Sequence, residues 1–232
     1  MVWWWLALGH ADPGAAVQLL QTHHGARALP SAPELPASAY TEALAGKVPT
    51  GLVDVPDHKA RVAWGLAVVD HPIDRYWAAV NDDRNKVAYT KLEHAELLDG
   101  SYCAAKRRVF QYVGVPLLSD RWWVVDLAHN GPLHEATGGA VRELSWRSRP
   151  DQAASLPESA RSWADKGMEV PFTEGAWALV DLGDGRTLVQ YYVWSDPGGN
   201  VPAGLASSFA EGGVSDTIEA MARLAAKGPS CL

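Results

Sequence analysis

The sequence predicts an α+β fold in which an antiparallel sheet is covered by a long C-terminal helix. Through the second half of the chain, short segments of alternating large and small residues are separated by compact turn signals, the pattern of strands in a meander. The chain then ends in an amphipathic segment, residues 202–226. Residues 195–202 join the last strand to this helix through a proline and paired glycines, which suit a sharp turn. A helix directed back across a sheet predicts a lid over an internal cavity.

The first 46 residues are expected to lie outside the main fold. Residues 1–11 are apolar and resemble the end of a signal peptide, but no basic segment precedes them, so we interpret them as a truncated leader. Residues 12–46 should form a helical extension and linker, with helices over 12–22 and 38–45. The main domain is then expected over residues 47–228.

The main fold is expected to begin with two strands and a helix. Strands are predicted over residues 47–55 and 59–70, and the break at Pro72 starts a helix over residues 73–82. Further strands are predicted over residues 87–98, 102–113, 121–128, 141–147, 177–182 and 188–194, with a short helix over 159–166. In the last helix, Gly212 and Gly213 predict a bend, a break or close packing. A break with Asp216 and Glu219 as a capping box is the competing interpretation.

Composition argues against several classes of protein. A net charge of -7 disfavours a nucleic-acid binder, and no window reaches the roughly 20 apolar residues of a membrane span. The eight histidines form no cluster with a third ligand, and the chain has no phosphate-binding loop, so we expect neither metal nor cofactor. No signature of a nucleophilic Ser or Cys is present either. Cys103 and Cys231 could pair in an oxidising compartment, but two unrelated thiols is the preferred interpretation.

Charged residues set among apolar strand residues mark a possible polar group inside the fold. Asp126 follows Trp122 to Val125, and Arg107 lies between two other basic residues in the expected neighbouring strand. An internal ion pair involving Arg107 and Asp126 would orient a polar head of a ligand or specify packing. The alternative, held equally open, is that both groups point outward.

Three segments carry a resemblance to a known family. Residues 194–202, and more weakly residues 69–77 and 119–123, are similar to motifs of the START (StAR-related lipid-transfer) domains of the Bet v 1-like helix-grip class. The likeness covers about residues 50–226, although here Asp120 precedes Arg121 where many members have Arg before Asp. The resemblance implies an α+β helix-grip fold: a curved antiparallel sheet wrapped around a long C-terminal helix, with an internal hydrophobic cavity for one lipid.

The leading functional prediction is non-enzymatic binding and transfer of a hydrophobic lipid, sterol or phospholipid-like, with transient contact to a membrane surface. The C-terminal helix and the apolar loop 113–118 would gate the cavity. The protein is expected to be a monomer that binds no nucleic acid, exported or periplasmic if residues 1–11 are a signal remnant, and otherwise cytoplasmic. The expected ligand-binding residues are Phe110, Tyr112, Trp123, Trp146, Trp177, Tyr192, Trp194, Leu205, Phe209 and Ile218, with Arg107 and Asp126 as polar cavity candidates.

Two other functions remain open from the sequence. One is an enzyme on the same scaffold, of the polyketide cyclase or aromatase type, in which Arg107, Asp126 and a histidine would act as acid, base or orienting groups. The other is a protein-interaction module, since eleven Trp against three Phe would also suit a partner-binding surface.

Overall fold

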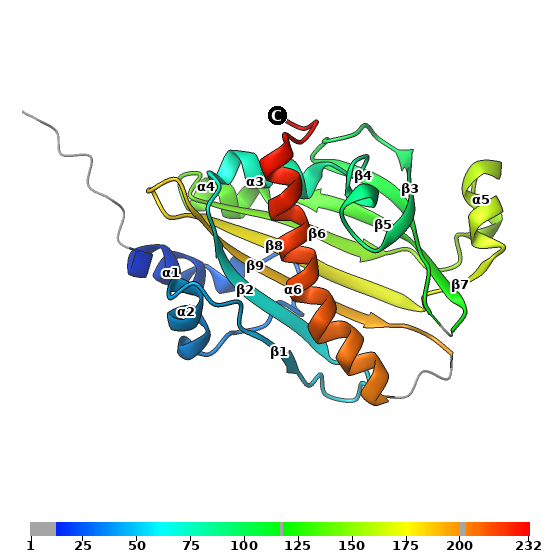
Figure 1. The fold of residues 1–232 in the computed structure, drawn as a ribbon, viewed down its shortest axis with the longest axis horizontal. Helices are drawn as coiled ribbons and strands as arrows, with labels where there is room; N and C mark the ends of the chain where they lie inside the picture. The colour runs from blue at the N-terminus through cyan, green and yellow to red at the C-terminus, as the bar shows by residue number, and fades with distance from the viewer. Residues whose placement is uncertain (1–12, 117, 200–202) are drawn as a thin grey trace, which may run out of the picture.

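The computed structural model describes residues 13–116, 118–199 and 203–232, with the side chains of residues 203–212 left out. Within these residues, nine strands form one curved sheet in the order β1-β2-β9-β8-β6-β5-β4-β3, with β7 beside β5, and β1 and β3 at its edges (Figure 1). All neighbouring strands are antiparallel except the pair β5 and β7. The strands are β1 (Thr50–Val53), β2 (Val62–Val69), β3 (Leu92–Asp99), β4 (Lys106–Val113), β5 (Asp120–His129), β6 (Val141–Ser148), β7 (Gly167–Glu169), β8 (Phe172–Asp181) and β9 (Thr187–Asp196).

The helices agree with the sequence prediction except for one short element. They are α1 (Pro13–Thr22), α2 (Ala37–Leu44), α3 (Ile73–Asn81), α4 (Gly131–Ala136), α5 (Glu158–Ala164) and α6 (Ala203–Lys227), with 3-10 turns η1 (His24–Ala26), η2 (Lys86–Ala88) and η3 (Ala153–Ser155). Helix α4 was not predicted; its first turn is capped by the Asn130 side chain, which accepts a hydrogen bond from the Leu133 N–H at 3.1 Å. Strand β7, which is only three residues long, was not predicted either.

Helix α6 lies across the concave face of the sheet (Figure 1). Ile218, Met221 and Leu224 of α6 are buried in one cluster with Val125 of β5 and Trp177 of β8. Because successive residues of a strand point to opposite faces, the concave face carries every second residue of each strand. This cluster is the first of two layers of core.

Of the alternatives that Gly212 and Gly213 left open, a break in α6 is excluded, because one continuous helix runs from Ala203 to Lys227. Asp216 forms an ion pair with Lys91 at 3.0 Å and Glu219 lies 3.8 Å from Arg223, so neither acts as a cap. Close packing of α6 on the sheet depends on a different glycine, Gly65 of β2. A Cβ atom there would lie 2.4 Å from Val214 Cγ1, so only glycine permits this approach of helix and strand.

The turn before α6 has the conformation that its sequence predicts. Gly198 and Gly199 have φ values of +66° and +67°, in the left-handed region that glycine adopts without strain. The buried Arg121 guanidinium holds this turn by donating to the Pro197 carbonyl at 2.6 Å and to the Gly198 carbonyl at 3.2 Å. Two of the segments that resemble START motifs therefore contact each other. Residues 200–202 of the same motif lie outside the described residues.

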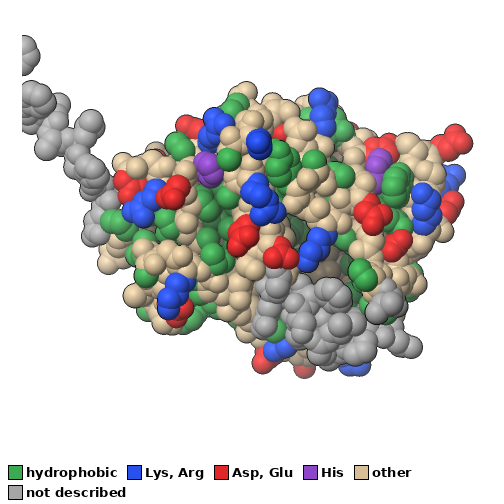
Figure 2. All heavy atoms as spheres, in the orientation of Figure 1, with side chains coloured by type: hydrophobic (Ala, Val, Ile, Leu, Met, Phe, Trp, Pro, Cys, Tyr) green, Lys and Arg blue, Asp and Glu red, His purple; other side chains and the backbone are tan. Residues whose placement is uncertain are grey.

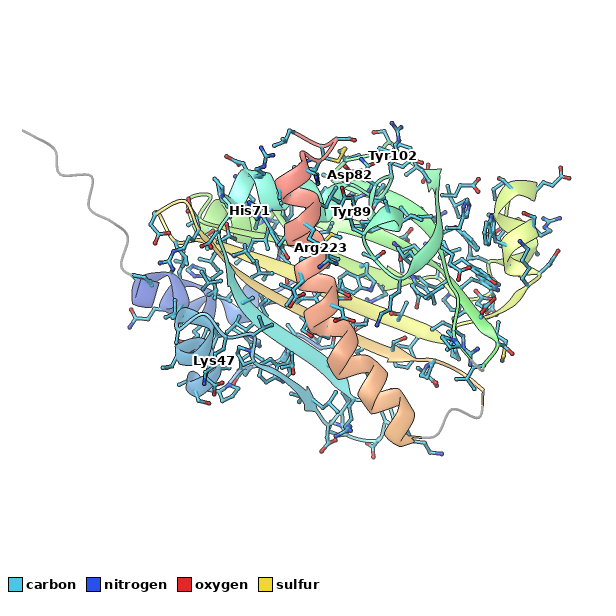
Figure 3. All side chains as sticks on the ribbon, in the orientation of Figure 1. Lys47, His71, Asp82, Tyr89, Tyr102 and Arg223 are labelled. Atoms are coloured by element: carbon cyan, nitrogen blue, oxygen red, sulfur yellow. A yellow bond between two sulfur atoms is a disulfide. The ribbon has the colours of Figure 1, made fainter. Side chains whose placement is uncertain are left out.

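A disulfide fixes the C-terminal end of α6. Cys103 and Cys231, 128 residues apart, are bonded, so the preference for two unrelated thiols is wrong. Sequence separation hid this pair, because only the fold brings the β3–β4 turn beside the residues that follow α6. Asp82 and Tyr102 lie at this same end of the molecule (Figure 3). Arg75 of α3 adds to the anchor, since its Nε donates to the Ala225 carbonyl at 2.6 Å.

The N-terminal extension covers the convex face of the sheet. Leu20 of α1 and Tyr40 of α2 are buried in a second cluster with Leu66 and Leu188 of the sheet. The extension also contributes a charge to this interface, since Arg27 Nε lies 2.5 Å from Glu143 Oε1 and both side chains are almost fully buried. Residues 13–46 are therefore packed into the core.

The described part of the face that carries α6 shows no concentration of charge (Figure 2). On the face that carries α6, Lys, Arg, Asp and Glu side chains are scattered among apolar and neutral ones (Figure 2). Among the described helices, none combines the length and the apolar character that crossing a bilayer requires. The predicted leader, residues 1–11, falls outside the described residues.

Candidate functional site

A cavity of about 240 Å³ lies between α6 and the concave face of the sheet. Residues of η2, the segment after it and six strands form its wall, and Thr217 and Met221 of α6 close it. The lining residues are Lys86, Thr90, Lys91, Leu92, Gln111, Val113, Trp123, Val125, Leu127, Leu144, Trp146, Trp177, Tyr191, Thr217 and Met221. Most of this wall is apolar or aromatic, which is the typical lining of a site for a small hydrophobic molecule.

Four aromatic side chains make up the broadest part of the wall. The Tyr191 ring lies 4.2 Å from the Trp177 ring and stacks on the Trp146 ring at 5.7 Å between centroids. The Trp123 indole N–H donates to Gln111 Oε1 at 2.7 Å, so its polar atom is satisfied within the wall. Burial raises the pKa of the Tyr191 hydroxyl, which therefore stays neutral at ordinary pH. The aromatic wall is therefore uncharged.

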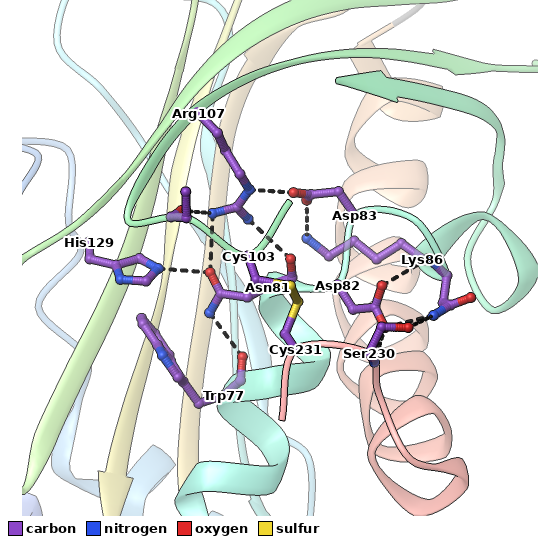
Figure 4. The surroundings of a disulfide bond; sticks show 12 residues. Trp77, Asn81, Asp82, Asp83, Lys86, Cys103, Arg107, His129, Ser230 and Cys231 are labelled. Atoms are coloured by element: carbon purple, nitrogen blue, oxygen red, sulfur yellow. Dashed lines mark hydrogen bonds and ion pairs between the residues drawn. A yellow bond between two sulfur atoms is a disulfide. The ribbon is translucent and has the colours of Figure 1, made fainter. Parts of the chain in front are cut away.

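One end of the cavity meets a buried group of charged and polar residues (Figure 4). Asp83 accepts a hydrogen bond from Lys86 Nζ at 3.0 Å and a short one from Arg107 Nε. Together, Lys86 and Arg107 overcome the effect of burial and hold the pKa of the Asp83 carboxyl below its usual value. Arg107 Nη1 and His129 Nε2 both contact the Asn81 amide oxygen, at 3.2 Å and 2.8 Å. Of these five residues, Lys86 lines the cavity.

His129 completes this group as a neutral imidazole. Burial, followed by the positive charges of Arg107 and Arg142, lowers its pKa from 6.5 to about 4. Since the Asn81 amide oxygen can only accept, the His129 Nε2 carries the proton of the neutral ring. The polar end of the cavity thus holds a neutral histidine at physiological pH.

Three of the predicted ligand-binding residues line this cavity: Trp123, Trp146 and Trp177. Ile218 is buried beside them in the same cluster under α6. The side chains of Leu205 and Phe209 lie outside the described residues. Contact of any of these residues with a ligand stays a prediction.

Four of the predicted residues lie on the opposite face of the sheet. Phe110 and Tyr112 of β4 are buried against α5, and the Tyr112 hydroxyl donates to Asp120. Tyr192 and Trp194 of β9 belong to the convex cluster. The parity of the two strands decides this placement, because the concave positions are Gln111 in β4 and Tyr191 in β9, next to the residues that we selected. Gln111 and Lys86 were not predicted, because polar residues give no sign that they line an apolar cavity. Tyr191 was not predicted, because the sequence does not distinguish it from its neighbour Tyr192.

The expected pairing of Arg107 with Asp126 is not present. Asp126 points to the convex side and pairs with Arg108 at 2.8 Å and with Arg149 at 3.1 Å, all partly exposed. Arg107 pairs instead with Asp83, which comes from the end of α3. Adjacent strand residues face opposite sides, so Arg108 faces the same side as its cross-strand partner Asp126 while Arg107 faces the concave side. The two polar candidates therefore do not converge on one site.

A second depression, of about 250 Å³, lies on the other face beneath the N-terminal extension. Its lining is largely polar and includes Gln21, His24, Arg27 and Gln190. Two of these are engaged with each other, since Arg27 Nη1 donates to Gln190 Oε1 at 2.8 Å. We assign the candidate site to the cavity under α6, because its continuous aromatic wall provides the apolar area that a ligand would bury.

The fold of this chain is similar to those of solved START domains. No protein-family model matches the chain, and no curated protein matches its sequence. A STAR-related lipid transfer protein fragment from Xanthomonas axonopodis has 18% sequence identity and a TM-score of 0.63, over 77% of this chain and 93% of that one. Human StAR-related lipid transfer protein 5 has 10% identity and a TM-score of 0.62, over 92% of this chain and 96% of that one. The chain has a START-like helix-grip fold.

Proposed function

We propose that the protein binds a hydrophobic lipid in the cavity under α6 and transfers it without chemical change. The observation that carries this proposal is the aromatic wall of Trp123, Trp146, Trp177 and Tyr191, which faces an open volume. Apolar surface buried from water contributes roughly 25 cal/mol per Å². A ligand lying along this wall would therefore be held mainly by burial, with a few polar groups setting its direction.

Uptake of a ligand requires α6 or a neighbouring segment to move. The C-terminal end of α6 is held by the disulfide and by Arg75. The loop 113–118 begins at the cavity, since Val113 is part of its lining, although residue 117 is outside the described residues. Aliphatic groups of this loop would contact a membrane surface during transfer, while α6 rotates away from the wall.

The distribution of tryptophan supports a ligand cavity over a partner-binding surface. Each of the eight Trp residues that the structure describes is buried or half-buried. A Trp-rich surface for protein recognition would instead expose indole rings together on one patch. The described part of the molecule has no such patch, and its exposed large apolar residues are Val48, Val53, Met168 and Leu232.

Native mass spectrometry of gently purified protein, followed by organic extraction, tests the proposal directly. We expect lipid to be retained in stoichiometric amount. A protein that emerges free of lipid and takes up none from vesicles would refute lipid binding.

A cavity-filling variant tests the position of the site. Thr217 lines the cavity, and Thr217→Trp would fill it with an indole ring. Glu219→Trp places the same ring on an exposed position of α6 and serves as the matched control. We expect Thr217→Trp to reduce lipid uptake at least about tenfold while the control binds normally, since the filled volume is the one the ligand needs. Equal uptake by both variants would place the lipid elsewhere.

A further inference from the structure

The charged residues along the cavity are all basic. Two lysines, Lys86 and Lys91, are among the described lining residues, and no Asp or Glu is among them. Lys91 is exposed and pairs with Asp216 of α6 at 3.0 Å. Lys86 is buried and belongs both to the cavity lining and to the charged group drawn in Figure 4. The uncharged polar lining adds donors, since Gln111 uses its amide oxygen to accept from Trp123 while its NH₂ bonds to none of the described residues.

Lys86 has hydrogen-bond donors that the described residues around it leave unused. Its ammonium has three N–H groups, and among the described residues one of them is bonded, to Asp83 Oδ1. Asp83 also receives Arg107, so two cations share one carboxylate. The nearby Asp82 adds a second negative charge but does not bond Lys86, because its carboxylate accepts from Asn85 Nδ2 at 2.8 Å and from the Ser230 N–H at 2.6 Å. A buried cation with unused donors gains from a further anionic acceptor.

The size of the cavity limits the ligand. Pockets for drug-sized molecules typically measure about 300–1,000 Å³, and this cavity is smaller at about 240 Å³. That volume suits a single chain or a compact molecule better than a lipid with two acyl chains. The aromatic wall would cover the chain, and the Lys86 end would take the head.

We propose that the cavity binds a single-chain amphiphile with a carboxylate head, such as a fatty acid, and that Lys86 donates a hydrogen bond to that head. This inference rests on the proposed function and specifies the chemical class of its ligand. Binding by apolar burial alone would depend only on the length of the chain. The proposal requires in addition that ligands of equal chain length bind with different affinities according to the charge of their heads.

The test compares three ligands with the same twelve-carbon chain: dodecanoate, dodecan-1-ol and dodecylamine. Binding is followed by the change in tryptophan emission, since three Trp residues line the cavity, and by native mass spectrometry. We expect the wild-type protein to bind dodecanoate at least about tenfold more tightly than dodecan-1-ol, the usual effect of a charge-assisted hydrogen bond. Dodecylamine should bind more weakly than the alcohol. This series needs no variant and decides the question even if substitutions impair folding.

Variants then assign the preference to one residue. Lys86→Met should reduce the preference for dodecanoate to within about twofold while dodecan-1-ol still binds, and Lys86→Arg should retain it. Lys106→Met, at an exposed position outside the lining, is the matched control and should behave as wild type. Loss of the preference in Lys91→Met, with Lys86→Met unchanged, would overturn the role of Lys86.

These outcomes distinguish the proposed carboxylate head group from the proposed lipid binding on which it rests. Equal affinity of the wild-type protein for dodecanoate and dodecan-1-ol would overturn the carboxylate head while leaving lipid binding intact. Failure to bind any of the three ligands, with no lipid retained on purification, would refute the proposed function itself.

Discussion

Trp122 and Trp123 are neighbours in β5 but serve opposite faces of the sheet. Trp122 is buried on the convex side, where its ring lies 5.8 Å from Phe110 and packs within the cluster beneath α5. Trp123 faces the concave side and borders open volume. The two faces are built from the same strands and differ in what covers them. Around Trp122 the sheet is packed against α5, whereas around Trp123 it borders the cavity that we propose for a ligand.

The convex face is closed by charge as well as by apolar packing. Glu143 is fully buried and accepts hydrogen bonds from Arg27 Nε, from the Ala28 N–H at 2.8 Å and from Asn130 Nδ2 at 2.7 Å. These contacts join residues 26–28 of the N-terminal segment to the sheet and α4. Such a network depends on every partner, so it should tolerate substitution poorly.

The largest expected effect is at this network. Arg27→Met leaves Glu143 as a buried carboxylate without its cation, and we expect unfolding free energy to fall by about 3–5 kcal/mol. Chemical denaturation measures this change. Arg147→Met is the control, because Arg147 pairs with Glu174 at the surface, where a pair is worth about 1 kcal/mol or less. A similar small loss in both variants would show that the extension does not stabilise the convex face through this pair.

The neighbouring tryptophans provide the sharpest test of the difference between the faces. Trp122→Ala should cost about 3–5 kcal/mol in unfolding free energy, because it empties a filled core. Trp123→Ala should cost less, about 1–2 kcal/mol, because its ring already borders open volume.

Ligand affinity should show the reverse order. Trp123→Ala removes part of the cavity wall and should weaken lipid binding, whereas folded Trp122→Ala should bind normally. Denaturation and lipid titration on the same samples measure both quantities. Equal effects on stability and binding would mean that the two faces do not divide these roles.

The smallest expected effect concerns pH and the polar end of the cavity. In the unfolded chain His129 takes up a proton near pH 6.5, whereas in the folded protein its pKa is about 4. The unfolded state therefore binds more protons between these values, and stability falls as pH decreases from 6.5 to 4. Because His129 is partly exposed, we expect a loss of about 1 kcal/mol after screening. Denaturation curves of His129→Gln should lack this part of the decline, and an identical pH profile in the variant would contradict the prediction.

The order of the elements could be predicted from sequence, because turns and periodicity are local. Residues such as Pro13, Pro72 and the glycines at 198–199 mark element boundaries through their own backbone preferences, and the structure agrees with them. The START-like fold followed from the same signals together with the resemblance.

The face on which each aromatic residue lies could not be predicted, because both faces of the sheet are covered. Alternation identifies the inner side of a strand only when the other side is polar. In β9, Tyr191 and Tyr192 are adjacent tyrosines, one under α6 and the other under the N-terminal extension. Local sequence does not distinguish them. The Arg107–Asp83 pair and the disulfide were also missed, since each joins segments that only the tertiary fold brings together.

The disulfide beyond α6 restrains one end of a long helix. With 25 residues, α6 is about 37 Å long at 1.5 Å per residue. The disulfide, Arg75 and the buried contacts of Ile218 all hold the C-terminal half of α6, so any displacement of the helix would grow with distance from that end. A tilt of only about 5° would shift the far end by roughly 3 Å. Reduction of the disulfide would remove one of these restraints and leave the Arg75 hydrogen bond and the buried contacts in place.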